Sequence, residues 1–71
     1  MTREEIKIFR KELAANMPNT RLRRGQIVFN ALYEAKPEWA DEIRGSDKDP
    51  FYCDSNLGAF GDWFEGKMEA E

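Results

Sequence analysis

The sequence contains no histidine and a single cysteine among its 71 residues. Without histidine, the chain lacks the commonest general base in enzymes and the commonest side-chain ligand for metals. The lone Cys53 cannot form a disulfide within the chain, and no cysteine and histidine set exists to hold a structural zinc ion. These absences exclude most hydrolase and metalloenzyme schemes at this length. We therefore expect a protein that is not an enzyme, with no catalytic residues, no metal site and no cofactor.

Long apolar runs are absent as well. No stretch approaches the roughly 20 apolar residues that a membrane-spanning helix needs, and residues 1–9 are charged, unlike a secretory signal. We therefore expect no membrane partner and a cytoplasmic location. A single thiol fits a reducing compartment, and we expect Cys53 to be half-buried and unreactive because no base is present to activate it.

The length predicts a single domain over residues 1–71 with few means of support. A chain of this size buries only about 60% of the surface that it exposes when unfolded. Small domains usually compensate with disulfides, a structural metal or association. Because the first two are missing here, either a homodimer or a complex with another protein is the remaining source of stability.

The spacing of apolar residues predicts an all-α fold, a compact bundle of three to four short helices with a turn-rich loop before the last helix. Thr2 and Glu5 have the spacing of a capping box, which predicts a first helix that ends near Asn16. Asn19 and Thr20 are candidate caps for a second helix that runs to about residue 35.

A third, short helix is predicted to begin at Pro37 and to stop before Gly45. Asp54 or Ser55 is placed to cap the last helix. We expect the third helix to direct three apolar residues inward, namely Trp39, Ala40 and Ile43.

The first and last helices carry apolar stripes with the same spacing but flanks of opposite charge. Lys7 and Lys11 lie beside the first stripe, whereas Asp62, Glu65 and Glu69 lie beside the last. This pattern predicts that the two helices are neighbours in space. Three glycines weaken the last helix by up to about 1 kcal/mol each relative to alanine, so that helix needs either tight packing at the glycines or a partner. They are Gly58, Gly61 and Gly66.

The overall net charge of −3 hides two halves of opposite sign. Residues 1–36 contain eight basic and four acidic residues, whereas residues 37–71 contain three basic and ten acidic ones. One interpretation is that the halves lie against each other and neutralise. The other is an acidic face that binds a basic partner.

Acidic and aromatic residues of the second half form the candidate partner-binding face. An EF-hand register that starts at Asp47 fails, because Tyr52 occupies the glycine position and Gly58 the glutamate position. The alternative interpretation is structural, with Asp47, Asp49 and Asp54 satisfying amides of the turn and capping the last helix. The candidate partner-binding residues are Asp47, Asp49, Tyr52, Asp62, Trp63, Glu65 and Glu69.

Arg21, Arg23 and Arg24 form a basic cluster where the second helix is predicted to start. Positive charge in a first turn opposes the helix dipole, so these side chains need compensation. They either pair with the acidic half or bind an external anion such as phosphate, carboxylate or nucleic acid. A nucleic-acid contact is disfavoured because the third helix, which follows, is acidic.

The stretch GQIVFNALYEAKPEWADEIRGSDKDPFYCD, residues 25–54, resembles a segment of small, uncharacterised phage and prophage helical proteins. The resemblance implies no catalytic residue; it implies a setting in which small acidic proteins bind and modulate a host or defence protein. We therefore predict a protein–protein interaction module whose acidic, aromatic C-terminal half binds a basic surface of such a protein. The alternative is a small nucleic-acid-binding protein that uses the cluster at Arg21, Arg23 and Arg24.

Overall fold

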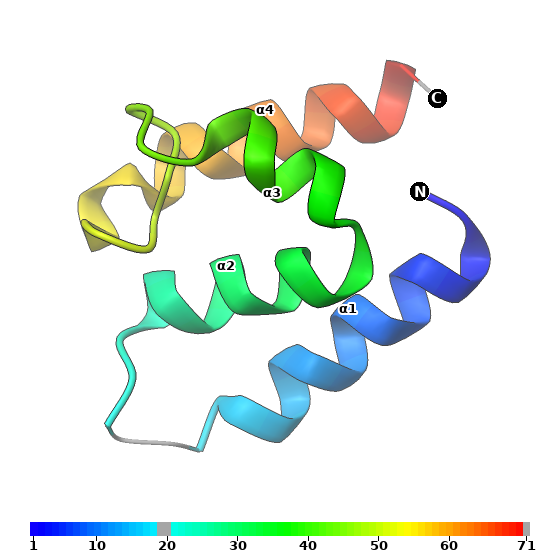
Figure 1. The fold of residues 1–71 in the computed structure, drawn as a ribbon, viewed down its shortest axis with the longest axis horizontal. Coiled ribbons are helices and arrows are strands. Elements are labelled where there is room, and N and C mark those ends of the chain that lie inside the picture. The colour runs from blue at the N-terminus through cyan, green and yellow to red at the C-terminus, as the bar shows by residue number, and fades with distance from the viewer. Residues whose placement is uncertain (19–20, 71) are drawn as a thin grey trace.

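The computed structural model describes residues 1–18 and 21–70, and these form helices and turns without any strand (Figure 1). The predicted all-α bundle of short helices, with a turn-rich loop before the last helix, is therefore confirmed. The elements are α1 (Arg3–Asn16), α2 (Arg24–Ala35), α3 (Pro37–Ile43), the 3-10 turn η1 (Asp54–Asn56) and α4 (Leu57–Ala70).

The predicted capping box starts α1. The Thr2 hydroxyl accepts a hydrogen bond from the Glu5 backbone N–H at 3.1 Å, and the Glu5 carboxylate accepts one from the Thr2 N–H at 2.7 Å. Two amides that the helix leaves unpaired are thus satisfied reciprocally. The helix ends at Asn16, as the sequence predicts.

The second helix begins later than the sequence predicts. Its candidate caps, Asn19 and Thr20, lie outside the described residues, and α2 starts only at Arg24, with Arg23 as the N-cap residue. The Gln26 side chain accepts a hydrogen bond from the Arg23 N–H at 3.0 Å. The late start leaves a single arginine, Arg24, within the first turn, which limits the unfavourable interaction with the helix dipole.

The third helix has the predicted limits. Pro37 is its first residue, where the missing N–H costs no hydrogen bond, and Gly45 follows its end with φ of 76°, a conformation that favours glycine. Trp39, Ala40 and Ile43 are buried, as predicted.

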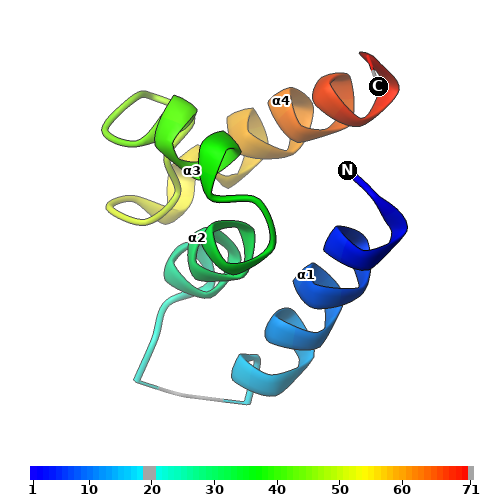
Figure 2. The same cartoon turned by 45° about the vertical axis from the view of Figure 1, so that its right-hand side comes forward.

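The core lies between α2, α3 and α4, with α1 packed along α2 (Figures 1 and 2). The end helices contact each other near their middles, where the Phe9 and Phe64 rings stack with centroids 5.2 Å apart. The predicted neighbourhood of α1 and α4 thus includes this aromatic contact, while α1 packs mainly on α2. The core cluster comprises Phe29, Leu32, Trp39, Ala40, Ile43 and Phe60.

Candidate protein-interaction site

The outward side of α4 carries three exposed carboxylates that have no partner among the described residues. The side chains of Asp62, Glu65 and Glu69 make no ion pair or hydrogen bond with any other described residue. They share this side with the three glycines of the helix, which are also exposed. We call this surface the acidic face of α4; it consists of Gly58, Gly61, Asp62, Glu65, Gly66 and Glu69.

The glycines of the acidic face are not explained by packing within the chain. A Cβ atom built at Gly58, Gly61 or Gly66 would meet no atom of residues 1–18 and 21–70 within 4 Å. Tight internal packing, one of the two explanations for these glycines, is therefore wrong. Their cost to helix stability, up to about 1 kcal/mol each, is left without an internal compensation.

Trp63 lies at the edge between α3 and α4 rather than on the acidic face. Its indole N–H donates a hydrogen bond to Glu42 at 3.0 Å, and its ring meets Trp39 edge-on at 6.0 Å. Lys67 donates to the other Glu42 oxygen at 3.0 Å, and this hydrogen bond is the main reason that the pKa of Glu42 is lowered. The half-buried Trp63 therefore helps to join the two helices and leaves only part of its ring at the surface.

Asp49 does not belong to a binding surface, contrary to its prediction as a partner-binding residue. It is only 1% exposed, and its carboxylate accepts hydrogen bonds from the N–H groups of Gly45 at 2.8 Å and Phe51 at 2.9 Å. Asn56 donates to its backbone carbonyl at 3.0 Å. The structural interpretation of Asp49 is thus correct: it satisfies amides of the turn between α3 and η1. Asp47 is exposed on the same turn.

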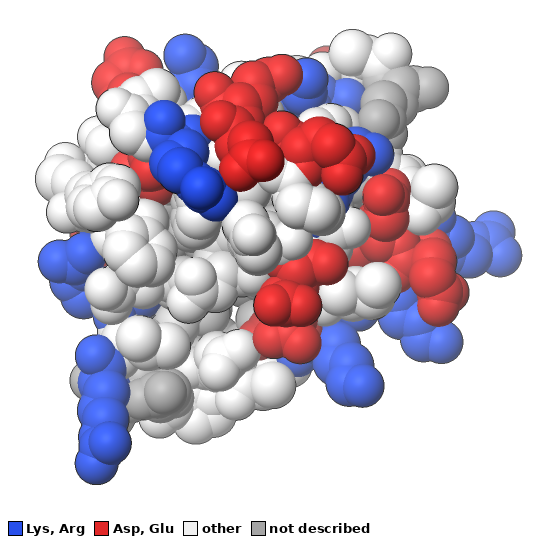
Figure 3. Space-filling view, viewed as in Figure 1, with Lys and Arg blue, Asp and Glu red and all other residues white. Residues whose placement is uncertain are grey.

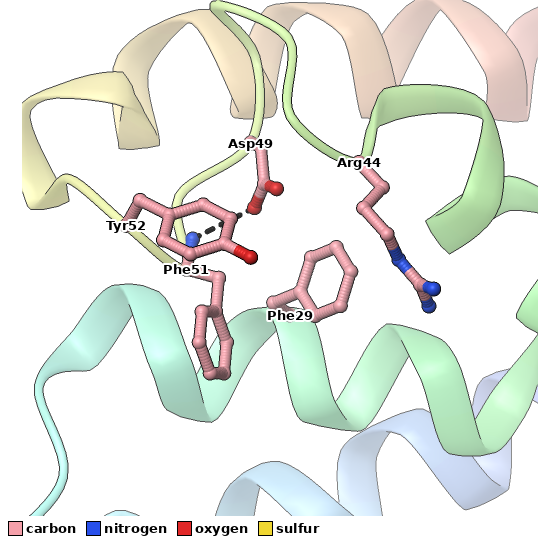
Figure 4. A pocket seen from close by; sticks show the side chains of 5 residues that line it. All are labelled: Phe29, Arg44, Asp49, Phe51 and Tyr52. Atoms are coloured by element: carbon pink, nitrogen blue, oxygen red, sulfur yellow. Dashed lines mark hydrogen bonds between the residues drawn. The ribbon is translucent and has the colours of Figure 1, made fainter.

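The turn that Asp49 organises forms one wall of an open pocket of about 230 Å³ (Figure 4). Tyr52 is 68% exposed and packs edge-on against Phe51 with centroids 5.2 Å apart. The pocket is smaller than the roughly 300–1,000 Å³ of most small-molecule sites, so its size suits a single side chain. Its lining residues are Phe29, Arg44, Asp49, Phe51 and Tyr52.

The predicted arginine cluster does not act as one unit. The guanidinium of Arg23 donates to the Phe51 carbonyl and lies 3.7 Å from the Asp54 carboxylate, so this arginine pairs with the acidic half. The Arg24 side chain makes no hydrogen bond or ion pair within the described residues. Arg21 is exposed in the turn before α2. Of the two interpretations of the arginines, pairing with the acidic half thus holds for Arg23.

Asp54 caps α2 and not the last helix, which corrects the prediction. Its carboxylate accepts a hydrogen bond from the N–H of Gly25, in the first turn of α2, at 3.1 Å. Asp54 itself begins η1, which separates it from the start of α4. The carboxylate also compensates the arginine charge beside the start of α2, because negative charge is favourable at a helix N-terminus.

Cys53 is exposed, whereas the sequence predicts a half-buried residue. Its sulfur lies 2.8 Å from the Ser55 hydroxyl, and hydrogen bonding with this hydroxyl lowers the pKa of the thiol. Cys53 directly precedes η1, and the nearby Phe51, rather than Cys53, packs against the core.

Within the part of the chain that the structure describes, carboxylates and cationic side chains are only partly paired with one another. In the view of Figure 3, carboxylates gather over α3 and towards α1, and many lysines and arginines lie at the margin. Two ion pairs between described residues join the halves, Arg23 with Asp54 and Lys36 with Glu38. The acidic half therefore keeps most of its excess charge at the surface.

A second unpaired surface lies on α1 and was not recognised as a unit in the sequence. Four cationic side chains are exposed along one side of this helix, and none makes an ion pair or a hydrogen bond with a described residue. Their common helical side could have been found from the spacing, because residues three, four and seven apart share a face. We call this surface the basic face of α1; it consists of Arg3, Lys7, Arg10 and Lys11.

None of the helices in residues 1–18 and 21–70 is long and apolar enough to cross a membrane, and no group of three or more Cys, Asp or Glu side chains there could hold a metal ion. Comparisons with protein-family models, with curated proteins and with solved structures gave no match.

Proposed function

We propose that this protein is a non-enzymatic interaction module whose acidic half binds a basic surface of another protein, with the acidic face of α4 as the main contact. The observation that carries the proposal is the absence of any described partner for Asp62, Glu65 and Glu69, although all three are exposed on one side of a helix. Unpaired charge of one sign on one surface steers an oppositely charged partner and selects against others.

The glycines of the acidic face support a partner that comes close to the helix. With no Cβ atoms at Gly58, Gly61 and Gly66, a backbone or a long side chain of the partner can lie directly on α4. Contacts formed there would also compensate the helix-weakening effect of the glycines, because any ligand that binds only the folded state stabilises it.

The biological setting belongs to the same proposal. Residues 25–54 resemble part of small phage and prophage proteins, and a role in modulating a host or defence protein in the cytoplasm fits a small, acidic chain without catalytic groups. A nucleic-acid contact through Arg21, Arg23 and Arg24 has less support, because Arg23 is already paired with Asp54.

A basic helical peptide with lysines at every third and fourth position is a suitable probe, and binding is measured by calorimetry at low salt. We expect binding to the wild-type protein that weakens as salt is added. The variant Glu65→Lys/Glu69→Lys should bind at least about tenfold more weakly, since two contacts become repulsive.

The matched control is Glu4→Lys/Glu34→Lys, which changes the net charge equally but leaves the acidic face intact. It should bind the peptide nearly as well as the wild type. Equal weakening by both variants would mean that the peptide responds to overall charge only, and the proposal would fail. The same two variants, used as baits in a lysate of the native host, identify the partner as the protein that the control retains and the Glu65/Glu69 variant loses.

A further inference from the structure

The basic face of α1 is not used by the proposed function, and its side chains have no partner among residues 1–18 and 21–70. Its four cations share their side of the helix with one exposed acid, Glu4, and with small or apolar residues. The basic face of α1 therefore carries a charge opposite to that of the acidic face of α4. The other exposed residues on this side are Ile8, Ala14 and Ala15.

The two faces also match in spacing. The carboxylates lie at positions 62, 65 and 69, so the second and third are three and seven residues beyond the first. Counted backwards along α1 from Arg10, the cations Lys7 and Arg3 are again three and seven residues away. At about 1.5 Å of rise per residue, the second and third charges of each row lie about 4.5 and 10.5 Å along the helix axis from the first charge. Two helices placed antiparallel therefore bring all three pairs into register.

These rows do not meet inside one molecule. In the chain itself, α1 packs along α2, and its contact with α4 is the stacked pair of Phe9 and Phe64. The charged rows lie on the other, exposed sides of both helices. The pairing of opposite flanks that the sequence suggests within the bundle is thus absent among the described residues, and it is available only between molecules.

The acidic face of α4 also leaves room for the long side chains of the basic face of α1. The exposed side of α4 is formed by glycines, by Ala59 and Ala70, and by the three carboxylates, so it is nearly flat between the acids. The exposed side of α1 carries long Lys and Arg side chains. Such side chains lay their apolar stems on a neighbouring surface and extend their charged ends to its polar groups.

We propose that this protein self-associates, with the basic face of α1 in one copy lying antiparallel on the acidic face of α4 in a second copy. The ion pairs are Arg10 with Asp62, Lys7 with Glu65, and Arg3 with Glu69. Each copy contributes both faces, so the contact can occur twice in a two-fold pair or repeat head to tail. The proposal does not rest on the proposed function, although both use the acidic face of α4.

Charge reversal tests the contact through sedimentation velocity at low salt over a range of protein concentrations. The α1 variant, Arg3→Glu/Lys7→Glu/Arg10→Glu, and the α4 variant, Asp62→Lys/Glu65→Lys/Glu69→Lys, should each raise the dissociation constant at least about tenfold, because like charges then face each other. An equimolar mixture of the two variants should associate again.

The decisive variant carries all six reversals in one chain. Its net charge is that of the wild type, −3, and both faces are again complementary, so self-association should return to near the wild-type level. A further control, Glu34→Lys/Glu38→Lys/Asp47→Lys, has the net charge of the α4 variant with both faces intact and should associate like the wild type. Circular dichroism checks that each variant is folded.

The proposal is overturned if the wild-type chain stays monomeric at all concentrations. It is also overturned if the variant with all six reversals is folded but does not regain self-association. The α1 variant separates this proposal from the proposed function. It keeps the acidic face of α4, so it should lose self-association and still bind the basic peptide; a protein that self-associates as proposed but ignores the peptide contradicts the proposed function alone.

Discussion

The carboxylate of Asp54 accepts a hydrogen bond from the backbone N–H of Gly25, 29 residues earlier in the chain, at 3.1 Å. It thereby supplies the first turn of α2 with an acceptor that the N-cap residue, Arg23, does not provide. The start of the central helix and the turn before α4 are thus held together by one side chain. Arg23 strengthens this link through its contacts with Asp54 and the Phe51 carbonyl.

Replacing Asp54 with alanine should therefore destabilise the whole domain. Loss of a capping acceptor costs about 1–2 kcal/mol of the free energy of unfolding, and Asp54→Asn, which keeps one acceptor oxygen, should lie between alanine and wild type. Urea unfolding followed by circular dichroism measures the effect. The exposed Asp47 is the matched control, and Asp47→Ala should stay within about 0.5 kcal/mol of wild type. Equal values for the two alanine variants would show that Asp54 does not act as a cap.

Substitution by alanine should change the stability of the fold in opposite directions at Gly25 and at Gly58. At Gly25, a Cβ atom would lie 1.9 Å from the Pro50 carbonyl oxygen, which is backbone and cannot turn away, so Gly25→Ala should cost about 1–3 kcal/mol of stability. At Gly58, nothing lies within 4 Å, so Gly58→Ala should stabilise α4 by up to about 1 kcal/mol.

Thermal unfolding of both glycine variants checks the sign of each change. A destabilising Gly58→Ala would mean that the acidic face of α4 has packing contacts in the free protein. If Gly58→Ala stabilises the fold and weakens peptide binding, then Gly58 favours the interaction at the expense of stability. Such a trade-off between stability and function is common.

Local rules predicted much of the helical framework. The capping box of Thr2 and Glu5, the start of α3 at Pro37 and its stop at Gly45 all depend on residues that are close in sequence. The inward residues of α3 followed from helical periodicity in the same way.

Roles that depend on distant partners were not predicted. Asp54 was assigned to the helix that follows it, because nothing in the sequence shows that the free amide of Gly25 lies closer. Asp49 was placed on a binding face, whereas the amides around it draw its carboxylate into the turn. The exposure of Asp62 and Glu65 follows from how α4 packs, and their role in binding stays a prediction.

The stability of the fold should fall in acid because two carboxylates have lowered pKa values. The pKa of Glu5 lies below its usual 4.5 chiefly because the Thr2 N–H donates to it, and that of Glu42 chiefly because Lys67 donates to it. A carboxylate with a lowered pKa in the folded state contributes stability above the pKa that it has when unfolded. This contribution is lost as the pH falls through the folded-state pKa.

Melting temperatures between pH 7 and pH 3 test this assignment for Glu42. At pH 7, Glu42→Gln should melt below the wild type, because glutamine cannot form the charged contact with Lys67 that links α3 to α4. As the pH falls through the lowered folded-state pKa of Glu42, the wild-type carboxyl group also becomes neutral, and the two curves should converge. The exposed Glu34, which makes no ion pair within the described residues, provides the control Glu34→Gln, whose melting curve should follow that of the wild type throughout. A gap between Glu42→Gln and wild type that persists unchanged at pH 3 would assign the effect to packing rather than to the charge of Glu42.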